Sequence, residues 1–254
     1  MDKQLVEGKV LLFDKPYEWT SFDVVGRVRS MIRKAYGLKK LKVGHAGTLD
    51  PLATGLMIVC TGKCTKQIDL IQQGEKEYVA TIELGKTTPS FDKETQIDGT
   101  YPFEHITQSL INDVLSKFIG TIQQIPPVFS AKMIDGKRAY ESARNGKEVE
   151  MKASTIEIKK MEFLKFEMPF LELKIVCSRG TYIRSLARDI GFELGSGAYL
   201  TALRRTKSGE YKVENALSIE AFENQLRLND DINNNLEEKK LFTKTYNRHE
   251  TFTV

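Results

Sequence analysis

The segment GHAGTLDPLATG, residues 44–55, places one carboxylate in a loop whose residue types control backbone geometry. Asp50 lies among three glycines and directly before Pro51. Glycine lets a backbone approach a ligand closely, and proline restricts the preceding residue to extended conformations. A carboxylate held beside a ligand in this way could serve as a nucleophile. An Asp-Pro pair can equally organise a turn, and the residue types alone do not decide between these interpretations.

A basic segment precedes this loop. Between Asp23 and Asp50 the chain carries seven Lys or Arg residues and no acid, although the net charge of the whole chain is only +4. Such a patch can bind along a phosphate backbone. A solvent-exposed helix face carries similar runs of charge, and composition alone favours neither interpretation. The seven residues are Arg27, Arg29, Arg33, Lys34, Lys39, Lys40 and Lys42.

The elements that must position these residues mix helices and strands. Val24, Val25 and Val28 begin a helical apolar pattern after a cap at Thr20 or Ser21. Strict strand–helix alternation is absent, which favours an α+β fold with a largely antiparallel sheet. We expect strands at 9–14, 56–60, 78–84, 154–166, 170–177 and 198–205, helices at 20–35, 66–73, 107–118, 138–144, 181–194 and 218–228, and a loop at 86–101.

Composition limits the class of protein. The 254 residues are 41% hydrophobic, and no apolar segment approaches the roughly 20 residues that a membrane helix needs. The first residues lack the pattern of a signal peptide, so we expect a cytoplasmic protein without a membrane segment. Cys60 and Cys64 lack the second pair or His cluster that would complete a zinc site, and no metal is expected.

Residues 44–55 resemble the signature of the TruB family of tRNA pseudouridine synthases, with Asp50 at the catalytic aspartate. The resemblance implies the pseudouridine synthase fold: a mixed, mainly antiparallel sheet with flanking helices and a central RNA-binding cleft. It also implies isomerisation of the T-loop uridine of tRNA, known as position 55, to pseudouridine. Further segments that resemble the family, in the same order, are 76–78, 125–132, 136–140 and 177–188.

The resemblance also implies roles for other side chains. Arg184 matches the position that pairs with the aspartate, and arginine suits this role because it keeps its charge and offers two parallel donors. Tyr78 matches the active-site tyrosine, which can stack on the flipped uracil and accept or relay a proton. His45 matches a position that helps to hold the disrupted T loop. Phosphate contacts are expected from Lys39, Lys40, Lys42, Lys66 and Arg138.

The implied reaction breaks the uracil N1–C1′ bond, turns the base, and joins C5 to C1′. No atom is gained or lost, so we expect no cofactor. The target base is buried in the folded T loop and must be flipped into a pocket, at a cost of a few kcal/mol. The expected partner is the T arm of tRNA, and a monomer is favoured.

The chain is expected to divide into a catalytic domain at 1–228 and a tail at 229–254, which begins with an Asn-rich, acidic stretch. Many family members carry a C-terminal PUA domain that binds RNA. The residues after the last core helix are too few for a compact domain of usual size. We therefore expect recognition to lie in the T arm.

Two other functions compete with isomerisation. An RNA chaperone could fold tRNA without chemistry, but binding alone would not need the combination of Asp50, Tyr78 and Arg184. The sequence does not exclude this activity as an addition. A glycosidase would need two carboxylates, and the matching segments contain no partner for Asp50.

Overall fold

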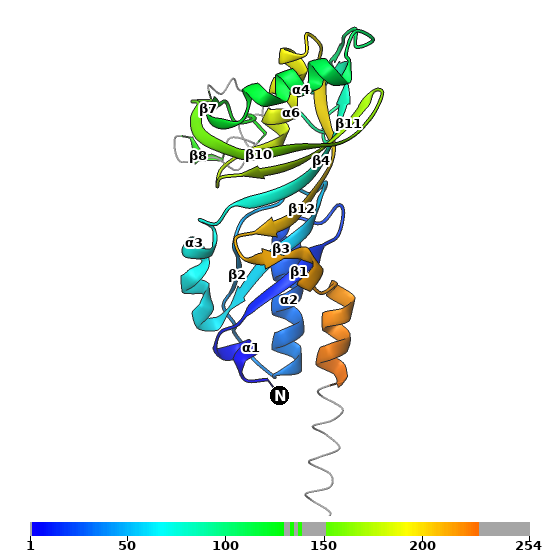
Figure 1. The fold of residues 1–254 in the computed structure, drawn as a ribbon. Coiled ribbons are helices and arrows are strands. Elements are labelled where there is room, and N and C mark those ends of the chain that lie inside the picture. The colour runs from blue at the N-terminus through cyan, green and yellow to red at the C-terminus, as the bar shows by residue number, and fades with distance from the viewer. Residues whose placement is uncertain (1, 130–132, 135–136, 139–150, 229–254) are drawn as a thin grey trace, which may run out of the picture.

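The computed structural model describes residues 2–129, 133–134, 137–138 and 151–228 (Figure 1). A nine-stranded sheet runs along the molecule in the order β1-β3-β12-β4-β11-β10-β7, with β2 paired to β3 and β13 paired to β12. These strands are β1 Val10–Lys15, β2 Val43–His45, β3 Ala53–Thr61, β4 Lys76–Leu84, β7 Gly120–Gln124, β10 Ser154–Glu167, β11 Phe170–Cys177, β12 Ala198–Ser208 and β13 Tyr211–Lys212.

The sheet is mainly antiparallel, as predicted. Among the strand pairs within the described residues, only β3 and β12 run parallel, with Leu203 opposite Ala53 and Arg205 opposite Gly55. A hairpin at Met168-Pro169 joins β10 to β11. The sheet therefore combines local hairpins with several pairings between segments that are far apart in sequence, namely β12 with β3, β12 with β4 and β11 with β4.

Helices cover the sheet at its two ends (Figure 1). At one end α4 and α6 pack against β4, β10 and β11 over one hydrophobic core. At the other end α2 and a helix at residues 219–228 pack against β1 and β3 over a second core. The helices are α1 Gln4–Glu7, α2 Ser21–Ala35, α3 Ile68–Ile71, α4 Gln108–Lys117 and α6 Ile183–Glu193, with 3₁₀ turns at Gly62–Gln67 (η1) and Val213–Asn215 (η2).

The start of α2 resolves which residue is the cap. The hydroxyl of Thr20 accepts from the backbone N–H of Asp23, and the Asp23 carboxylate accepts from the N–H of Thr20. This reciprocal pair satisfies two N–H groups that a helix start leaves open. Ser21 is therefore free to bond elsewhere, and it does so in the loop that carries Asp50.

Several predicted elements differ in detail. The expected loop at 86–101 contains a small ladder of β5 Lys86–Thr87 and β6 Gly99–Thr100, and the expected helix at 66–73 is split between η1 and α3. The expected helix at 181–194 begins at Ile183, and its N-cap residue Tyr182 makes no side-chain cap. Residue 138 ends the short hairpin of β8 Met133–Ile134 and β9 Lys137–Arg138 instead of opening a helix.

Two predictions fall outside what the structure describes: the remainder of the helix at 139–144 and the tail at 229–254. Within the described ranges, no helix is long and apolar enough to cross a bilayer.

Candidate active site

A pocket of about 360 Å³ lies beside β4 and β12, in the middle of the sheet. Its walls come from the loop after β2, from β4, from the start of α6 and from β12. Asp50, Tyr78 and Arg184, which are far apart in sequence, all line it. The fold thus brings together the three residues for which the family resemblance implies an active-site role.

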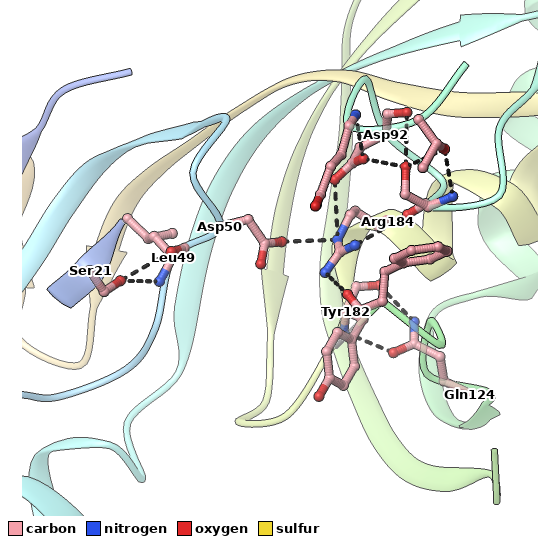
Figure 2. Close-up of polar contacts among 11 residues, drawn as sticks. Ser21, Leu49, Asp50, Asp92, Gln124, Tyr182 and Arg184 are labelled. Atoms are coloured by element: carbon pink, nitrogen blue, oxygen red, sulfur yellow. Dashed lines mark hydrogen bonds and ion pairs between the residues drawn. The ribbon is translucent and has the colours of Figure 1, made fainter. Parts of the chain in front are cut away.

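Asp50 and Arg184 form an ion pair in the lining of this pocket (Figure 2). Arg184 Nε lies 2.9 Å from Asp50 Oδ2, and the Arg184 side chain is 4% exposed whereas that of Asp50 is 41% exposed. The other guanidinium nitrogens donate to the carbonyls of Ser90, at 3.2 Å, and Phe129, at 3.0 Å. These carbonyls fix the orientation of the guanidinium, so its charge is directed at a carboxylate that remains open to a ligand.

A second carboxylate, Asp92, also reaches Arg184. Asp92 Oδ2 lies 3.5 Å from Arg184 Nε, and Asp92 accepts hydrogen bonds from the Ser90 hydroxyl at 2.6 Å and the Glu94 N–H at 2.9 Å. Burial raises the pKa of Asp92, and the Arg184 charge opposes this. Sequence reasoning missed Asp92 because it lies outside the matching segments. Asp92 is nearly buried and fully engaged, so it differs from the free second acid of a glycosidase.

Tyr78 and Arg205 are opposite each other on β4 and β12. Both line the pocket, and burial raises the pKa of Tyr78 while the charge of Arg205 opposes the rise. Arg205 is 1% exposed and donates to the carbonyls of Leu56 at 2.8 Å, Gly47 at 3.1 Å and Thr48 at 3.4 Å. Its sequence position indicated only a strand, and no local signal marked it as part of the site.

The loop that carries Asp50 is held from a second direction. The Ser21 hydroxyl donates to the carbonyl of Leu49 at 3.0 Å and accepts from its N–H at 2.9 Å (Figure 2). Lys15 Nζ donates to three carbonyls, among them those of Trp19 and Pro51. Burial lowers the pKa of Lys15 to about 8. A dense set of backbone contacts therefore fixes the position of Asp50.

Among the described side chains, those of His45, Lys39, Lys40, Lys42 and Lys66 lie outside the lining of the pocket. His45 ends β2, and its ring meets the ring of Phe22 edge to face, with centroids 5.7 Å apart. Burial lowers the pKa of His45. Arg138 belongs to β9, and its side chain lies outside the described part. Lys39, Lys40, Lys42 and Lys66 are exposed to solvent.

Comparison with protein families identifies this arrangement. The model of the TruB family pseudouridylate synthase N-terminal domain matches residues 33–183, which is more than half of the chain. The chain belongs to the TruB family of pseudouridylate synthases. The model of the tRNA pseudouridylate synthase B C-terminal domain matches residues 184–241. The predicted family membership is confirmed.

Proteins of similar sequence align with most of this TruB-family chain. The tRNA pseudouridine synthase B of Phocaeicola vulgatus is 59% identical over 216 residues, which cover 85% of this chain and 92% of that protein. The tRNA pseudouridine synthase B of Flavobacterium johnsoniae is 49% identical over 226 residues, covering 89% and 99%.

Solved structures support the TruB-family fold. A chain in the crystal structure of a Cbf5-Nop10-Gar1 complex matches with a TM-score of 0.64 and 30% identity. A chain in a structure of an H/ACA RNP bound to a substrate RNA matches with a TM-score of 0.61 and 28% identity. The present chain spans about half the length of each. The predicted α+β pseudouridine synthase fold is confirmed.

Proposed function

We propose that the protein isomerises the T-loop uridine of tRNA, at position 55, to pseudouridine. One observation carries the proposal: Asp50 lies 2.9 Å from the buried guanidinium of Arg184, at a pocket that Tyr78 also lines. The relatives named tRNA pseudouridine synthase B support tRNA as the substrate. The choice of the T loop rests on the resemblance of residues 44–55 to the family signature.

Asp50 is the catalytic carboxylate in this proposal. Its partly exposed oxygens can reach a sugar or base that enters the pocket, where the carboxylate either attacks as a nucleophile or stabilises charge as the glycosidic bond breaks. Arg184 Nε contacts one oxygen of Asp50 at 2.9 Å and so holds the carboxylate in position for either step.

Tyr78 provides the other part of the proposed chemistry. The volume of the pocket falls within the range of roughly 300–1,000 Å³ that small-molecule sites occupy, so a flipped uracil fits. The Tyr78 ring can stack on that base, and its hydroxyl can accept or relay a proton. Since every atom of the uridine stays in the product, the reaction calls for no cofactor.

In this proposal, basic side chains hold the RNA. We assign phosphate contacts to the exposed Lys39, Lys40, Lys42 and Lys66, and to Arg138, because lysine and arginine neutralise phosphates and release counterions. The protein makes its base-specific contacts with the T arm, because the target uridine is flipped there. We further propose that residues 1–228 form the catalytic domain of a monomer that works in the cytoplasm.

The decisive test replaces Asp50. Asp50→Asn preserves shape but removes charge, so we expect it to abolish pseudouridine formation while RNA affinity stays within a few-fold. Unmodified tRNA and an isolated T-arm hairpin are incubated with each protein, and pseudouridine is mapped by chemical reactivity. Asp113→Asn, on the exposed face of α4, is the matched control and should retain full activity. An active Asp50→Asn protein would contradict the proposal.

A further inference from the structure

The start of α6 is held by a side chain from a distant strand. Gln124, the last residue of β7, donates through Nε2 to the carbonyl of Tyr182 at 3.0 Å, and its Oε1 accepts from the Tyr182 N–H at 2.8 Å (Figure 2). Tyr182 is the N-cap residue of α6, two positions before Arg184. One side-chain amide thus binds both backbone polar groups of a single residue next to the active-site arginine.

This end of α6 has little support of its own. A helix leaves its first N–H groups without partners inside the helix, and the side chain of the N-cap residue commonly satisfies one of them. Within the described part of the chain, Tyr182 makes no such bond, and the first turn of α6 contains no acidic residue. The position of the helix start therefore depends on groups outside the helix.

The segment that follows β7 makes further contacts with the same turn. The Ser185 hydroxyl donates to the carbonyl of Ile125 at 2.8 Å, and Arg184 Nη2 donates to that of Phe129 at 3.0 Å. These two contacts join side chains of α6 to the neighbouring backbone. The Gln124 amide completes them by fixing the backbone of α6 itself.

The ion pair in the pocket therefore joins two segments that are anchored in the same way (Figure 2). On the carboxylate side, the Ser21 hydroxyl bonds both backbone polar groups of Leu49. On the guanidinium side, Gln124 does the same for Tyr182. The two charged groups are only 2.9 Å apart, so a small displacement of either segment would lengthen the contact beyond hydrogen-bond range.

Glutamine is suited to this place by its chemistry. Its amide carries a donor and an acceptor in one plane, which match the carbonyl and the N–H of one residue. A glutamate of the same size is acceptor-only when ionised, and a methionine of similar length offers neither group. Gln124 is 1% exposed, so a lost bond would leave a buried polar group unpaired.

We propose that Gln124 is a positioning residue for the isomerisation: it fixes the start of α6 and thereby holds Arg184 Nε at Asp50. Gln124 lies outside the lining of the described pocket, so it acts through Tyr182 and Arg184. The proposal rests on the proposed function, because the place of Arg184 affects a rate only if Asp50 performs the chemistry. It extends the active site to β7, the strand at the edge of the sheet.

The first test separates turnover from binding. Gln124→Met and Gln124→Glu should each lower kcat on the T-arm hairpin by about tenfold to a hundredfold, because a displacement of about 1 Å can cost about a hundredfold in rate. KM should change little, since the residues that line the pocket are intact. All proteins are compared at a temperature at which circular dichroism shows them fully folded.

The neighbouring residue supplies the matched control. Gln123 is exposed on the same strand, and its side chain donates to the Thr155 hydroxyl at 2.9 Å. Gln123→Glu makes the same change of charge one residue away and should leave kcat and KM unchanged. Equal losses in Gln123→Glu and Gln124→Glu would overturn the proposal, because the place of the amide would then not matter.

A double-variant cycle shows whether the effect passes through Arg184. In an Arg184→Lys background, Gln124→Met should lower kcat by less than about twofold, because the guanidinium that it positions is already absent. If the two losses multiplied instead, Gln124 would act independently of Arg184 and the proposal would be wrong.

A spectroscopic measurement tests the positioning without using the reaction. The proton–nitrogen correlation signal of Arg184 Nε–H is identified by its loss in Arg184→Lys, and its exchange with solvent is followed. Both Gln124 variants should shift this signal and speed its exchange at least about tenfold, because a bond that opens more readily protects its proton less. Gln123→Glu should do neither.

An unchanged Arg184 signal in both Gln124 variants would overturn the proposal, as would an undiminished kcat or a loss confined to KM. Failure of both variants to fold would make Gln124 a purely structural residue and would overturn it too. If the signal responded as expected while the natural chain made no pseudouridine, the positioning role would stand and the proposed function would fail.

Discussion

The two sides of the pocket each contain a buried arginine, but with different surroundings. Arg184 lies near two carboxylates, Asp50 at 2.9 Å and Asp92 at 3.5 Å. Arg205 is still less exposed, and it donates to three backbone carbonyls. A buried guanidinium is costly unless charge or hydrogen bonds compensate it. Arg184 thus sets the electrostatics of the reactive carboxylate, whereas Arg205 sets the shape of the loop that carries it.

Removing Arg205 should have the largest effect on stability. Arg205→Met leaves the carbonyls of Gly47, Thr48 and Leu56 without this donor, and each unsatisfied buried group costs about 1–3 kcal/mol. We expect the free energy of unfolding to fall by about 3 kcal/mol or more, measured by urea denaturation.

The neighbouring residue supplies the control. Arg204→Met breaks a partly exposed ion pair with Asp14 at 2.7 Å, and such pairs contribute about 0–1 kcal/mol. If both variants lost the same stability, the anchoring role of Arg205 would be wrong.

Changing Arg184 should instead affect activity more than stability. Arg184→Lys retains a positive charge near Asp92. It loses the planar guanidinium whose three nitrogens contact Asp50 and two backbone carbonyls. We expect kcat/KM to fall at least about a hundredfold, near 2.7 kcal/mol of transition-state stabilisation, with a smaller loss in unfolding free energy.

Arg188, one turn later in α6, is the matched control. It bonds Asp189 and lies 4.6 Å from the centre of the Phe91 ring, so Arg188→Lys should change kcat/KM by only a few-fold. If Arg184→Lys were fully active, the distinction between the two arginines would disappear.

Lys15 should give an effect that is visible only as a dependence of stability on pH. Its pKa is lowered to about 8 from an ordinary 10.5 by burial. Between these values the unfolded chain binds more protons than the folded one, so stability rises with pH through this window, with a slope of at most about 1.4 kcal/mol per pH unit. Below about pH 8 the cost of the buried charge is fully present.

Lys15→Met removes this titration. Urea denaturation of both proteins at about pH 7.5, 9 and 10.5 should therefore show a stability difference that changes in favour of the natural chain as pH rises. A stability difference between the two proteins that stayed constant from about pH 7.5 to 10.5 would contradict the lowered pKa of Lys15.

The sequence predicted the elements whose patterns are local. Val24, Val25 and Val28, whose spacing predicted a helix, lie on the buried face of α2. Every second residue of β11 is likewise buried. The closeness of Asp50 to Arg184 followed from the family resemblance, because no spacing rule links residues so far apart.

Asp92 and Arg205 had no such signal. Asp92 lies in a polar stretch that is typical of a surface loop, and Arg205 looks like an ordinary strand residue. Both are buried by tertiary contacts that sequence periodicity does not encode. The two-residue strands β5 and β6 are also too short for a period to be recognised.

The place of β12 in the sheet has a consequence for biosynthesis. It is the last long strand of the described chain, yet it lies between β3 and β4, which are made much earlier. As the nascent chain leaves the ribosome, β3 and β4 must wait for residues 198–208 before the sheet can close. Such high contact order slows folding, because loop closure precedes the stabilising contacts. We therefore expect synthesis to be nearly complete before the protein can engage its RNA.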